Sequence, residues 1–207
     1  MQKNDFLTLL EEFLGSSLAS EQLESLNRYL SLLLKWNKAY NLTAITDAKE
    51  MVVKHILDSL AINPYLQGTR VIDVGSGAGL PGIPLAIVNP DKHFALLDSN
   101  IKKVSFLNQV KLELDLNNIE VVHQRVEKYH PKHCFDIVIT RAFSSINNTL
   151  MNTKHLCCQE GAFLLMKGAY PQEELEEIPE DFVIRWARKL AVPELEAERH
   201  LVMLNFK

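Results

Sequence analysis

The amino-acid sequence predicts an α/β fold: a seven-stranded, mostly parallel sheet with helices on both faces, preceded by a helical extension. Three observations support this fold class. The first 66 residues carry helical patterns without a strand signal. From Arg70 onward, short β-rich runs alternate with helical runs, as in a parallel sheet whose two faces are covered. The last two β-rich runs have no helix of useful length between them, so we expect them to form an antiparallel pair.

Two helices are expected at the start of the chain. Leu10 and Leu14 fall at helical spacing from Phe6, and Gly15 is well placed to end this helix. Ser20 is expected to be the N-cap of a longer helix, which closes near Trp36–Asn41. The apolar face of that helix consists of Leu23, Leu26, Leu30, Leu33 and Leu34.

A third helix is expected to begin at Asp47, with Glu50 in the capping-box position, and to end before Pro64. Its apolar face consists of Val52, Ile56 and Leu60. We therefore assign residues 1–66 to an N-terminal helical extension packed on the core. Residues 67–207 are assigned to the domain that contains the sheet.

The alternating runs beyond residue 67 predict the strands and the helices between them. The expected strands are Arg70–Val74, Phe94–Asp98, Ile119–His123, Phe135–Thr140, Ala162–Lys167, Phe182–Leu190 and His200–Phe206. The expected helices are Ile83–Val88, Ile101–Leu114 and Ile146–Cys158.

The composition of the chain is that of a soluble globular protein. Of its 207 residues, 47% are hydrophobic and 23% are charged. No run approaches the roughly 18 apolar residues that a membrane span needs. The polar segment Met1–Asp5 does not resemble a signal peptide. We therefore expect a cytoplasmic protein with no membrane partner, and exclude disordered and fibrous classes.

The cysteines and histidines do not predict a disulfide framework or a metal site. There are three cysteines, an odd number, and two of them are adjacent. Cys157 and Cys158 fall on a helical run and are expected to pack in the core. His130 and His133 lie beside Cys134 at poor spacing and without a fourth ligand, so we expect no metal.

A glycine-rich loop follows the first strand. Asp73 lies at the strand end, and Gly75, Gly77 and Gly79 alternate after it. Glycine is needed where the backbone bends sharply or approaches a ligand without a Cβ in the way. The second strand ends at Asp98, and the ends of these two strands lie side by side in a doubly wound sheet. Because a carboxylate there can accept both hydroxyls of a ribose, the loop and Asp98 together predict a bound nucleoside.

Two kinds of nucleoside cofactor are considered for this loop. The segment Gly77–Gly82 matches the G-x-G-x-x-G pattern of dinucleotide sites, but a lone match is weak and its first glycine falls late after the strand end. Asp73 followed by alternating glycines is instead typical of class I S-adenosylmethionine-dependent methyltransferases. The pattern therefore favours S-adenosylmethionine, while NAD and a purely structural glycine turn stay open as alternatives.

The fourth strand is followed by Arg141, at the strand end that faces the transferable methyl group in a methyltransferase sheet. It lacks the Asn/Asp-Pro-Pro-aromatic turn of enzymes that methylate exocyclic amines, and no cysteine nucleophile for pyrimidine carbon lies near it. Acceptors that remain include a ring nitrogen such as guanine N7. Its attack requires no proton removal, so the enzyme would contribute mainly proximity and alignment. Arg141 is assigned a positioning role, with a salt bridge to a neighbouring acid as the alternative.

Several segments together resemble one bacterial family. They are Lys35–Thr43, Lys54–Leu60, Asp73–Pro84, Thr140–Phe143 and Glu198–Leu201. In combination they are similar to ribosomal RNA small subunit methyltransferase G, also called glucose-inhibited division protein B, over almost the whole chain. The resemblance implies a class I, Rossmann-like methyltransferase fold. It also implies transfer of a methyl group from S-adenosylmethionine to N7 of guanosine 527, in the 530 loop of 16S ribosomal RNA, with S-adenosylhomocysteine as the product.

The resemblance further implies which residues contact the cofactor. They are Gly75, Leu80, Val126, Glu127 and Arg141. Val126 and Glu127 lie in the turn after the third strand, where methyltransferases of this class lay backbone groups against adenine. Asp98 as the ribose acceptor, and Asp73 with Gly77 and Gly79 in the loop, follow from the pattern of residues itself.

Contacts to RNA are expected around the opening of the cofactor site. The candidates are His55, Lys167 and Arg199, with Lys35 and Lys38 on the N-terminal helices. A basic groove binds phosphates and makes affinity fall with salt. A guanine must also leave its stack to reach the methyl group, against an aromatic such as Phe143. For each residue the alternative is ordinary packing or a solvated surface.

The expected partner is 16S ribosomal RNA, free or within a 30S particle, and the protein is expected to be a monomer. Its formal net charge is −4, but residues 172–181 hold six acids and no base, and the rest of the chain is net positive. Overall acidity therefore does not exclude a polyanionic partner. No role is assigned to the acidic stretch.

Two other function classes stay open. A nicotinamide-dependent oxidoreductase would need a hydride-relay pair near the fourth strand, and none stands at a suitable spacing. A non-catalytic RNA-binding module would not need the glycine loop, Asp98 and Arg141 together.

Overall fold

The computed structural model describes residues 6–141 and 144–207. Its sheet has seven strands in the order β3-β2-β1-β4-β5-β7-β6. The strands are β1 (Arg70–Val74), β2 (His93–Asp98), β3 (Ile119–His123), β4 (Phe135–Arg141), β5 (Cys157–Lys167), β6 (Phe182–Lys189) and β7 (His200–Phe206). β7 is antiparallel to β5 and β6, and the other neighbouring strands are parallel. The predicted α/β fold with its closing antiparallel pair is confirmed.

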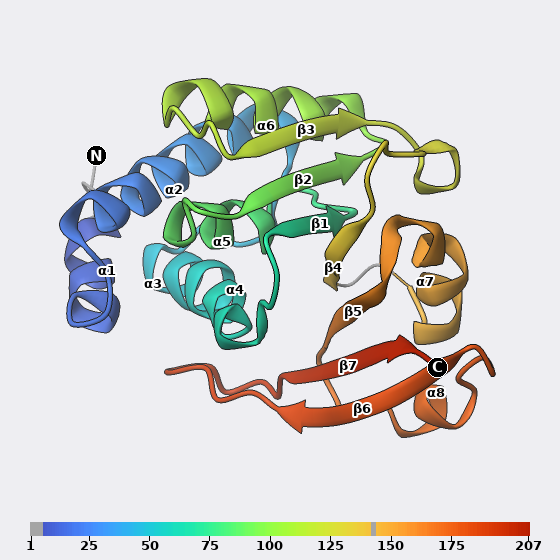
Figure 1. Ribbon diagram of the computed structural model, residues 1–207. Coiled ribbons are helices and arrows are strands. Elements are labelled where there is room, and N and C mark those ends of the chain that lie inside the picture. Colours follow the sequence, from blue (N-terminus) through green and yellow to red (C-terminus); the bar gives the residue numbers. More distant parts are fainter. Residues whose placement is uncertain (1–5, 142–143) are drawn as a thin grey trace.

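Helices cover both faces of this sheet (Figure 1). They are α1 (Phe6–Leu14), α2 (Ser20–Tyr40), α3 (Ala48–Met51), α4 (Asp58–Leu60), α5 (Gly82–Val88), α6 (Ile101–Glu113), α7 (Ile146–Thr153) and α8 (Gln172–Glu176). A π-helical segment, Val52–Leu57, joins α3 to α4, and short 3-10 turns lie at Asn63–Tyr65, Val126–Lys128 and Lys154–Leu156. Among the described residues, no helix combines the length and the apolar character that crossing a membrane requires.

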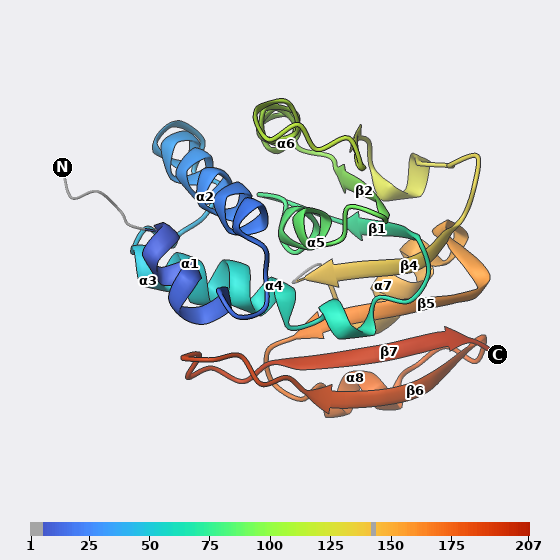
Figure 2. The same ribbon diagram turned by 60° about the vertical axis from the view of Figure 1, so that its left-hand side comes forward.

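The two faces of the sheet belong to two parts of the core. Val71 packs with the helices of one face, α2, α5 and α6, and Ile72 packs with α7 on the other. This period of two is the ordinary alternation of a strand. Figure 2 shows the two helical layers on opposite sides of the sheet. In this alternation Asp73 follows Val71, which places its side chain on the α5 side of β1.

The N-terminal helices share the first part of the core. Phe6 and Leu10 of α1 and Tyr29 of α2 are buried in the same apolar cluster as Val71. The Tyr29 hydroxyl donates a hydrogen bond of 2.9 Å to the carbonyl oxygen of Ala78. Helix α2 is therefore attached to the loop that follows β1.

The start of α2 differs from the prediction by one residue. Ala19, not Ser20, is the N-cap residue. Its side chain has no oxygen that could accept a hydrogen bond. The Ala19 backbone N–H instead donates to Gln22 Oε1 at 3.1 Å. This bond is the half of a capping box in which the N3 side chain accepts from the backbone of the N-cap residue.

The helix predicted from Asp47 is present, and Asp47 Oδ1 accepts a hydrogen bond of 2.9 Å from the Glu50 backbone N–H. The turns over Val52–Leu57 are π-helical, which the periodicity of the apolar residues did not predict. A π-helical turn widens the helix and is frequent at functional sites. Both His55 and Asp58 are buried within or directly after this segment.

The prediction about the cysteines is wrong in two respects. Cys134 and Cys158 form a disulfide, while Cys157 is a free, buried thiol. The helical run predicted to reach Cys158 ends earlier, and β5 begins at Cys157 instead of Ala162. The physical reason is an irregularity in the pairing of β4 with β5, in which Phe135 pairs with Cys157 before the regular register begins at Ile137. This extension places Cys158 near the residue that precedes β4.

Candidate active site

The carboxyl ends of β1, β2 and β4 surround the glycine loop. The backbone φ angles of Gly75, Gly77 and Gly79 are 73°, 60° and 89°, in the left-handed region that favours glycine. The Gly75 N–H donates a hydrogen bond of 2.8 Å to the carbonyl oxygen of Leu97 at the end of β2. The loop is therefore fixed to both strands, as the alternating glycines predicted.

Asp98, at the end of β2, is held by backbone groups. Its Oδ2 accepts a hydrogen bond of 2.9 Å from the Gly77 N–H, and its Oδ1 accepts one of 2.8 Å from the Asn100 N–H. Lys103 Nζ lies 3.8 Å from Oδ2. Each carboxylate oxygen has a second lone pair, so Asp98 can still accept hydroxyl groups.

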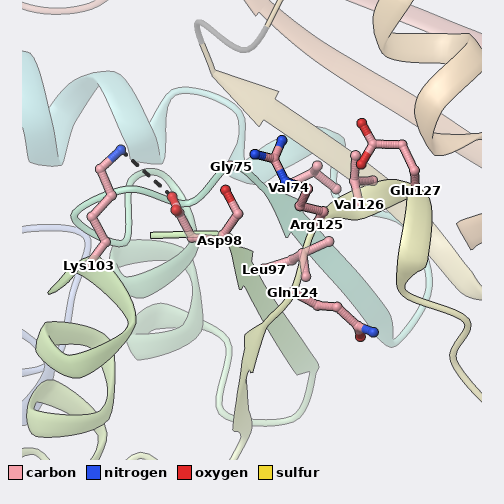
Figure 3. Close-up of a pocket in the computed structure, with 10 residues that line it drawn as sticks. Val74, Gly75, Leu97, Asp98, Lys103, Gln124, Arg125, Val126 and Glu127 are labelled. Carbon is pink, nitrogen blue, oxygen red and sulfur yellow. Dashed lines mark ion pairs between the residues drawn. The ribbon is translucent and has the colours of Figure 1, made fainter. Parts of the chain in front are cut away.

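A cleft of about 300 Å³ lies next to Asp98. It is lined by Val74, Gly75, Leu97, Asp98, Ser99, Lys103 and the segment 124–127. Figure 3 shows Asp98 and Lys103 on one side of the cleft and Gln124–Glu127 on the other. The structure therefore brings the predicted residues Gly75, Asp98, Val126 and Glu127 together around one cleft. Sequence reasoning missed Lys103, Gln124 and Arg125, whose positions depend on how α6 and the turn after β3 pack.

A second cavity, of about 230 Å³, lies on the other side of the glycine loop. We call it the loop cavity. It is lined by Leu42, Thr43, His55, Gly75, Ser76, Gly77, Ala78, Leu80, Lys103 and Arg141. Leu80 and Arg141 thus lie where the resemblance implied a cofactor contact, although Gly79 does not line either cavity. Gly79 packs against α5 and α6, since a Cβ there would lie 2.4 Å from Ile83 Cγ1 and 2.9 Å from Leu107 Cδ2.

Asp73 lies behind the loop and is completely buried. Its Oδ2 accepts a hydrogen bond of 3.0 Å from the Gly82 N–H, and its Oδ1 has no hydrogen-bond partner in the described part of the chain. Burial raises the pKa of Asp73 to about 7, against the lowering effects of the Gly82 N–H and of Arg141. Asp73 lines neither the cleft nor the loop cavity, so its unpaired oxygen lies behind the loop that separates them.

His55, predicted to contact RNA, is 4% exposed and lines the loop cavity. Its Nε2 lies 2.9 Å from Thr43 Oγ1, within hydrogen-bond distance, and its Nδ1 has no partner among the described residues. Burial and, to a lesser extent, the charge of Arg141 lower the pKa of His55 to about 4, so the ring is neutral at pH 7. The Thr43–His55 pair was not predicted because it depends on how the loop after α2 packs on the π-helical segment within the N-terminal extension.

A third cavity, of about 370 Å³, adjoins Arg141. We call it the arginine cavity. It is lined by Asp58, Arg141, Met166, Lys167, Gly168 and Arg199. The structure therefore brings Lys167 and Arg199, two of the residues predicted to contact RNA, to the same cavity as Arg141. Phe143 lies outside the described residues, and Lys35 and Lys38 do not line any of these three cavities.

Lys167 forms an ion pair with one residue of the acidic stretch 172–181. Its Nζ donates to Glu174 Oε2 at 2.8 Å and to the Ser144 carbonyl oxygen at 3.0 Å. Glu174 is one of the six acids in residues 172–181, so α8 supplies a counter-ion at the edge of the arginine cavity. This contact joins α8 to the end of β5.

The residues of the cleft and the loop cavity fit S-adenosylmethionine. Asp98 can accept the ribose hydroxyls, and Gly75 and the segment 126–127 line the same cleft. At Gly77 a Cβ would make only ordinary van der Waals contacts, 3.8 Å to Gly75 O and 3.9 Å to Lys103 Nζ, so the loop is not packed against the core there. In the described residues, no three His, Cys, Asp or Glu side chains gather as a metal site would require.

Comparison with known sequences gives matches over nearly the whole chain. A family model described as rRNA small subunit methyltransferase G matches residues 22–202. The chain is 55% identical to ribosomal RNA small subunit methyltransferase G of Nitrosococcus oceani over 192 residues, which cover 93% of this chain and 90% of the relative. It is 51% identical to the Pasteurella multocida protein of the same name, covering 99% and 97% of the two chains.

Solved structures share the fold at low sequence identity. A SAM-dependent methyltransferase from Aquifex aeolicus aligns with a TM-score of 0.58 at 17% identity, covering 75% of this chain and 92% of that one. One from Thiobacillus denitrificans, in complex with S-adenosyl-L-homocysteine, aligns with a TM-score of 0.54 at 11% identity, covering 73% and 90%. The predicted class I methyltransferase fold is thereby confirmed.

Proposed function

The chain belongs to the rRNA small subunit methyltransferase G family, and on this premise we propose that it methylates N7 of guanosine 527 in the 530 loop of 16S ribosomal RNA. It is an S-adenosylmethionine-dependent rRNA methyltransferase. The reaction converts S-adenosylmethionine to S-adenosylhomocysteine. The coarser activity, methylation of small-subunit rRNA, comes from the family. The choice of guanine N7 is argued from the site.

The observation that carries the function is the arrangement around the glycine loop. Asp98 and the segment 126–127 face one cleft, and Arg141 lines the cavity on the other side of the same loop. A nucleoside in the cleft therefore directs its substituent past Gly75 toward Arg141. When bound there, S-adenosylmethionine supplies an activated methyl group on a sulfonium centre.

The surroundings of Arg141 support a ring nitrogen as the acceptor. Cys157 is a poor nucleophile, because burial raises the pKa of its thiol to about 12, and it lies at the opposite end of β5. His55 is buried and neutral, and it belongs to the loop cavity instead of the arginine cavity. Guanine N7 carries a free lone pair and needs no base, so the protein has only to bind and align the two reactants.

The roles of individual residues follow from these positions. We propose that Asp98 binds the ribose, that Val126 and Glu127 lie against adenine, and that Gly75, Gly77 and Leu80 line the path toward the methyl group. Asp73 shapes the loop through the Gly82 N–H. Arg141 positions the acceptor, and Lys167 and Arg199 attract the RNA.

We also propose that the protein acts in the cytoplasm, as a monomer, on 16S rRNA or on a particle that contains it.

The direct test is transfer of a labelled methyl group. Purified protein is incubated with methyl-labelled S-adenosylmethionine and either 30S particles or deproteinised 16S RNA that lack the modification, and the product is mapped by cleavage at 7-methylguanosine. We expect label at one guanosine of the 530 loop. Label at another nucleotide would refute the proposed position, and label at that guanosine without cleavage would refute N7. Absence of label on both substrates, despite cofactor binding, would refute the ribosomal function.

Gly75→Val is the control for the role of the loop. A valine at φ 73° is strained, and its side chain would enter the cleft. We expect the variant to lose methyl transfer and S-adenosylhomocysteine binding while keeping RNA binding. A variant that loses RNA binding to the same extent would indicate a general loss of structure.

A further inference from the structure

We propose that Asp58 is a positioning residue, which holds the guanidinium groups of Arg141 and Arg199 at one cavity, and that this arginine cavity receives the acceptor nucleotide of an RNA chain. The proposal rests on the methyltransferase function above and extends it to the substrate side. Asp58 was not among the residues that the sequence singled out.

Asp58 joins two distant parts of the chain. Its carboxylate is 1% exposed, its Oδ2 accepts a hydrogen bond of 3.1 Å from Arg141 Nη1, and its Oδ1 accepts one of 2.8 Å from Arg199 Nε. Arg141 ends β4 and Arg199 directly precedes β7, while Asp58 follows the π-helical segment of the N-terminal extension. Both oxygens of one buried carboxylate therefore orient two arginines from opposite sides.

The two arginines keep donors for a ligand. Arg141 Nη1 also donates to the Lys54 carbonyl oxygen at 3.2 Å, and Arg199 Nη1 to the Glu198 carbonyl oxygen at 2.8 Å. Nη2 of each guanidinium has no hydrogen-bond partner within residues 6–141 and 144–207. Each side chain remains 25% exposed and lines the arginine cavity. Asp58 thus uses some of the N–H groups to fix each side chain and leaves others for an incoming acceptor.

The charge of the cavity suits one phosphate. Two guanidinium groups and one carboxylate leave a single net positive charge, and the ammonium group of Lys167 is already paired with Glu174. Arginine binds phosphate through parallel N–H groups better than lysine does. Without Asp58 the two guanidinium groups would repel each other, and neither would keep its orientation.

The position of the cavity suits a nucleotide that is about to react. Arg141 lines both the arginine cavity and the loop cavity, so a molecule in the first lies next to the methyl-donor side of the second. The volume of about 370 Å³ falls in the range of small-ligand pockets. Met166 and Gly168 provide an uncharged part of the wall, against which a base can lie while the arginines contact its phosphate.

The test compares Asp58→Asn with Asp58→Glu and with a matched control, Asp181→Asn. Asp181 is an exposed aspartate whose Oδ2 lies 3.6 Å from Lys154 Nζ, so this control makes the same change of charge away from the cavity. The measurements are the Kd of S-adenosylhomocysteine by calorimetry, kcat and KM for methyl transfer to 16S RNA, the binding of a fluorescent RNA fragment of the acceptor loop, and the melting temperature.

For Asp58→Asn we expect the Kd of S-adenosylhomocysteine to stay within threefold of the wild-type value. The KM for RNA should rise at least tenfold, and kcat/KM should fall at least thirtyfold. Asp58→Glu retains the negative charge and should restore part of this loss. Asp181→Asn should stay within twofold of the wild type in every measurement.

Three outcomes would overturn the proposal. The first is wild-type KM and kcat in Asp58→Asn. The second is a proportional loss of cofactor binding and RNA binding together with the melting temperature, which would make Asp58 purely structural. If Asp58→Asn does not fold, the third is wild-type KM in a folded Arg199→Gln, which removes one of the two guanidinium groups that Asp58 holds. If the wild-type protein itself transfers no methyl group, the proposed function fails, and the RNA-binding comparison alone decides the role of Asp58.

Discussion

The carboxyl group of Asp73 is the titratable group most closely attached to the glycine loop. Burial raises its pKa from 3.8 to about 7 in the folded protein. The protonated form therefore stabilises the fold in full below about pH 4, and this contribution is lost as the pH rises through 7. The ionised form is the one that can accept an ammonium group. Cofactor binding and protonation of Asp73 should consequently compete.

We predict that the affinity for S-adenosylhomocysteine rises about fivefold between pH 6 and 7.5, with release of a proton, because binding favours the ionised carboxylate. His55 does not contribute in this range, since its pKa of about 4 keeps it neutral throughout. Calorimetry in two buffers of different ionisation enthalpy measures both the affinity and the released proton. Asp73→Asn should remove the dependence on pH. A constant wild-type affinity over this range would show that Asp73 does not meet the ammonium group.

Replacing Gly79 with alanine should lower stability, whereas replacing Gly77 with alanine should mainly weaken cofactor binding. At Gly79 the added Cβ would lie 2.4 Å from Ile83 Cγ1, in a packed core, so we predict a loss of stability of about 3 kcal/mol. At Gly77 the Cβ makes only ordinary van der Waals contacts, so the cost is that of the positive φ, about 1 kcal/mol. Gly77→Ala should instead weaken S-adenosylhomocysteine binding at least tenfold.

Urea unfolding and calorimetry on both variants check this pair of expectations. If Gly77→Ala binds the cofactor as the wild type does, the space beside Gly77 is not part of the binding site. If Gly79→Ala keeps wild-type stability, α5 must move away from the loop without cost. The two results are independent, since one concerns the core and the other the cavity.

At the scale of elements, β4 and β5 carry the one disulfide among the described residues, Cys134–Cys158. Both cysteines lie at the amino ends of these strands, whereas the candidate site lies at the carboxyl ends. The bond closes a loop over a sequence separation of 24 residues, for which the loss of chain entropy predicts about 3 kcal/mol of stabilisation. Disulfides are rare in cytosolic proteins, so the cytoplasmic location proposed above implies the reduced form in the cell.

We predict that reduction of the purified protein lowers its melting temperature but leaves the Kd of S-adenosylhomocysteine within twofold. Thiol titration of the unreduced, denatured protein should give one thiol, that of Cys157, and titration after reduction should give three. The double variant Cys134→Ser/Cys158→Ser should behave as the reduced wild type. Three thiols before reduction would show that the bond is absent from the purified protein.

Elements could be predicted from the sequence wherever the pattern is local. The β1 and β3 strands occur at the predicted residues, because their apolar runs are bounded by clear turn signals. The disulfide and the early start of β5 could not be predicted, because they depend on an irregular pairing between β4 and β5. The π-helical turn around His55 was also missed, since the apolar spacing of an α-helix and that of one wider turn are too similar over so few residues.

In the candidate site too, residues placed by local patterns and sheet topology could be predicted, and residues placed by long-range contacts could not. Gly75 and Asp98 could be predicted together because the topology of a parallel sheet brings successive strand ends side by side. Asp58 could not, because its partners Arg141 and Arg199 lie 83 and 141 residues away in the sequence.

We propose that the segments on either side of residue 66 form one folding unit, since Phe6 and Val71 share one apolar cluster.

At the scale of the whole molecule, the net charge has the same sign as that of the proposed RNA partner. The formal net charge is −4, and six acids lie in residues 172–181, of which Glu174 reaches Lys167 at the edge of the arginine cavity while Asp181 pairs with Lys154 elsewhere. Glu174 of this stretch has a defined role as the counter-ion of Lys167. The exposed residues Glu173, Glu176 and Glu177 do not share that contact and repel an approaching RNA chain.

We therefore predict that the triple variant Glu173→Gln/Glu176→Gln/Glu177→Gln binds an RNA fragment of the acceptor loop about threefold more tightly at 0.05 M salt, mainly through faster association. The advantage should disappear at 0.5 M salt, because the Debye length there is only about 4 Å. The matched control, Glu11→Gln/Glu21→Gln/Glu24→Gln, makes the same change of net charge at exposed positions on α1 and α2. Stopped-flow fluorescence over a series of salt concentrations measures both variants. An equal gain in the control would mean that RNA responds only to the total charge, and no gain in either would mean that the acidic stretch lies outside the path by which RNA approaches.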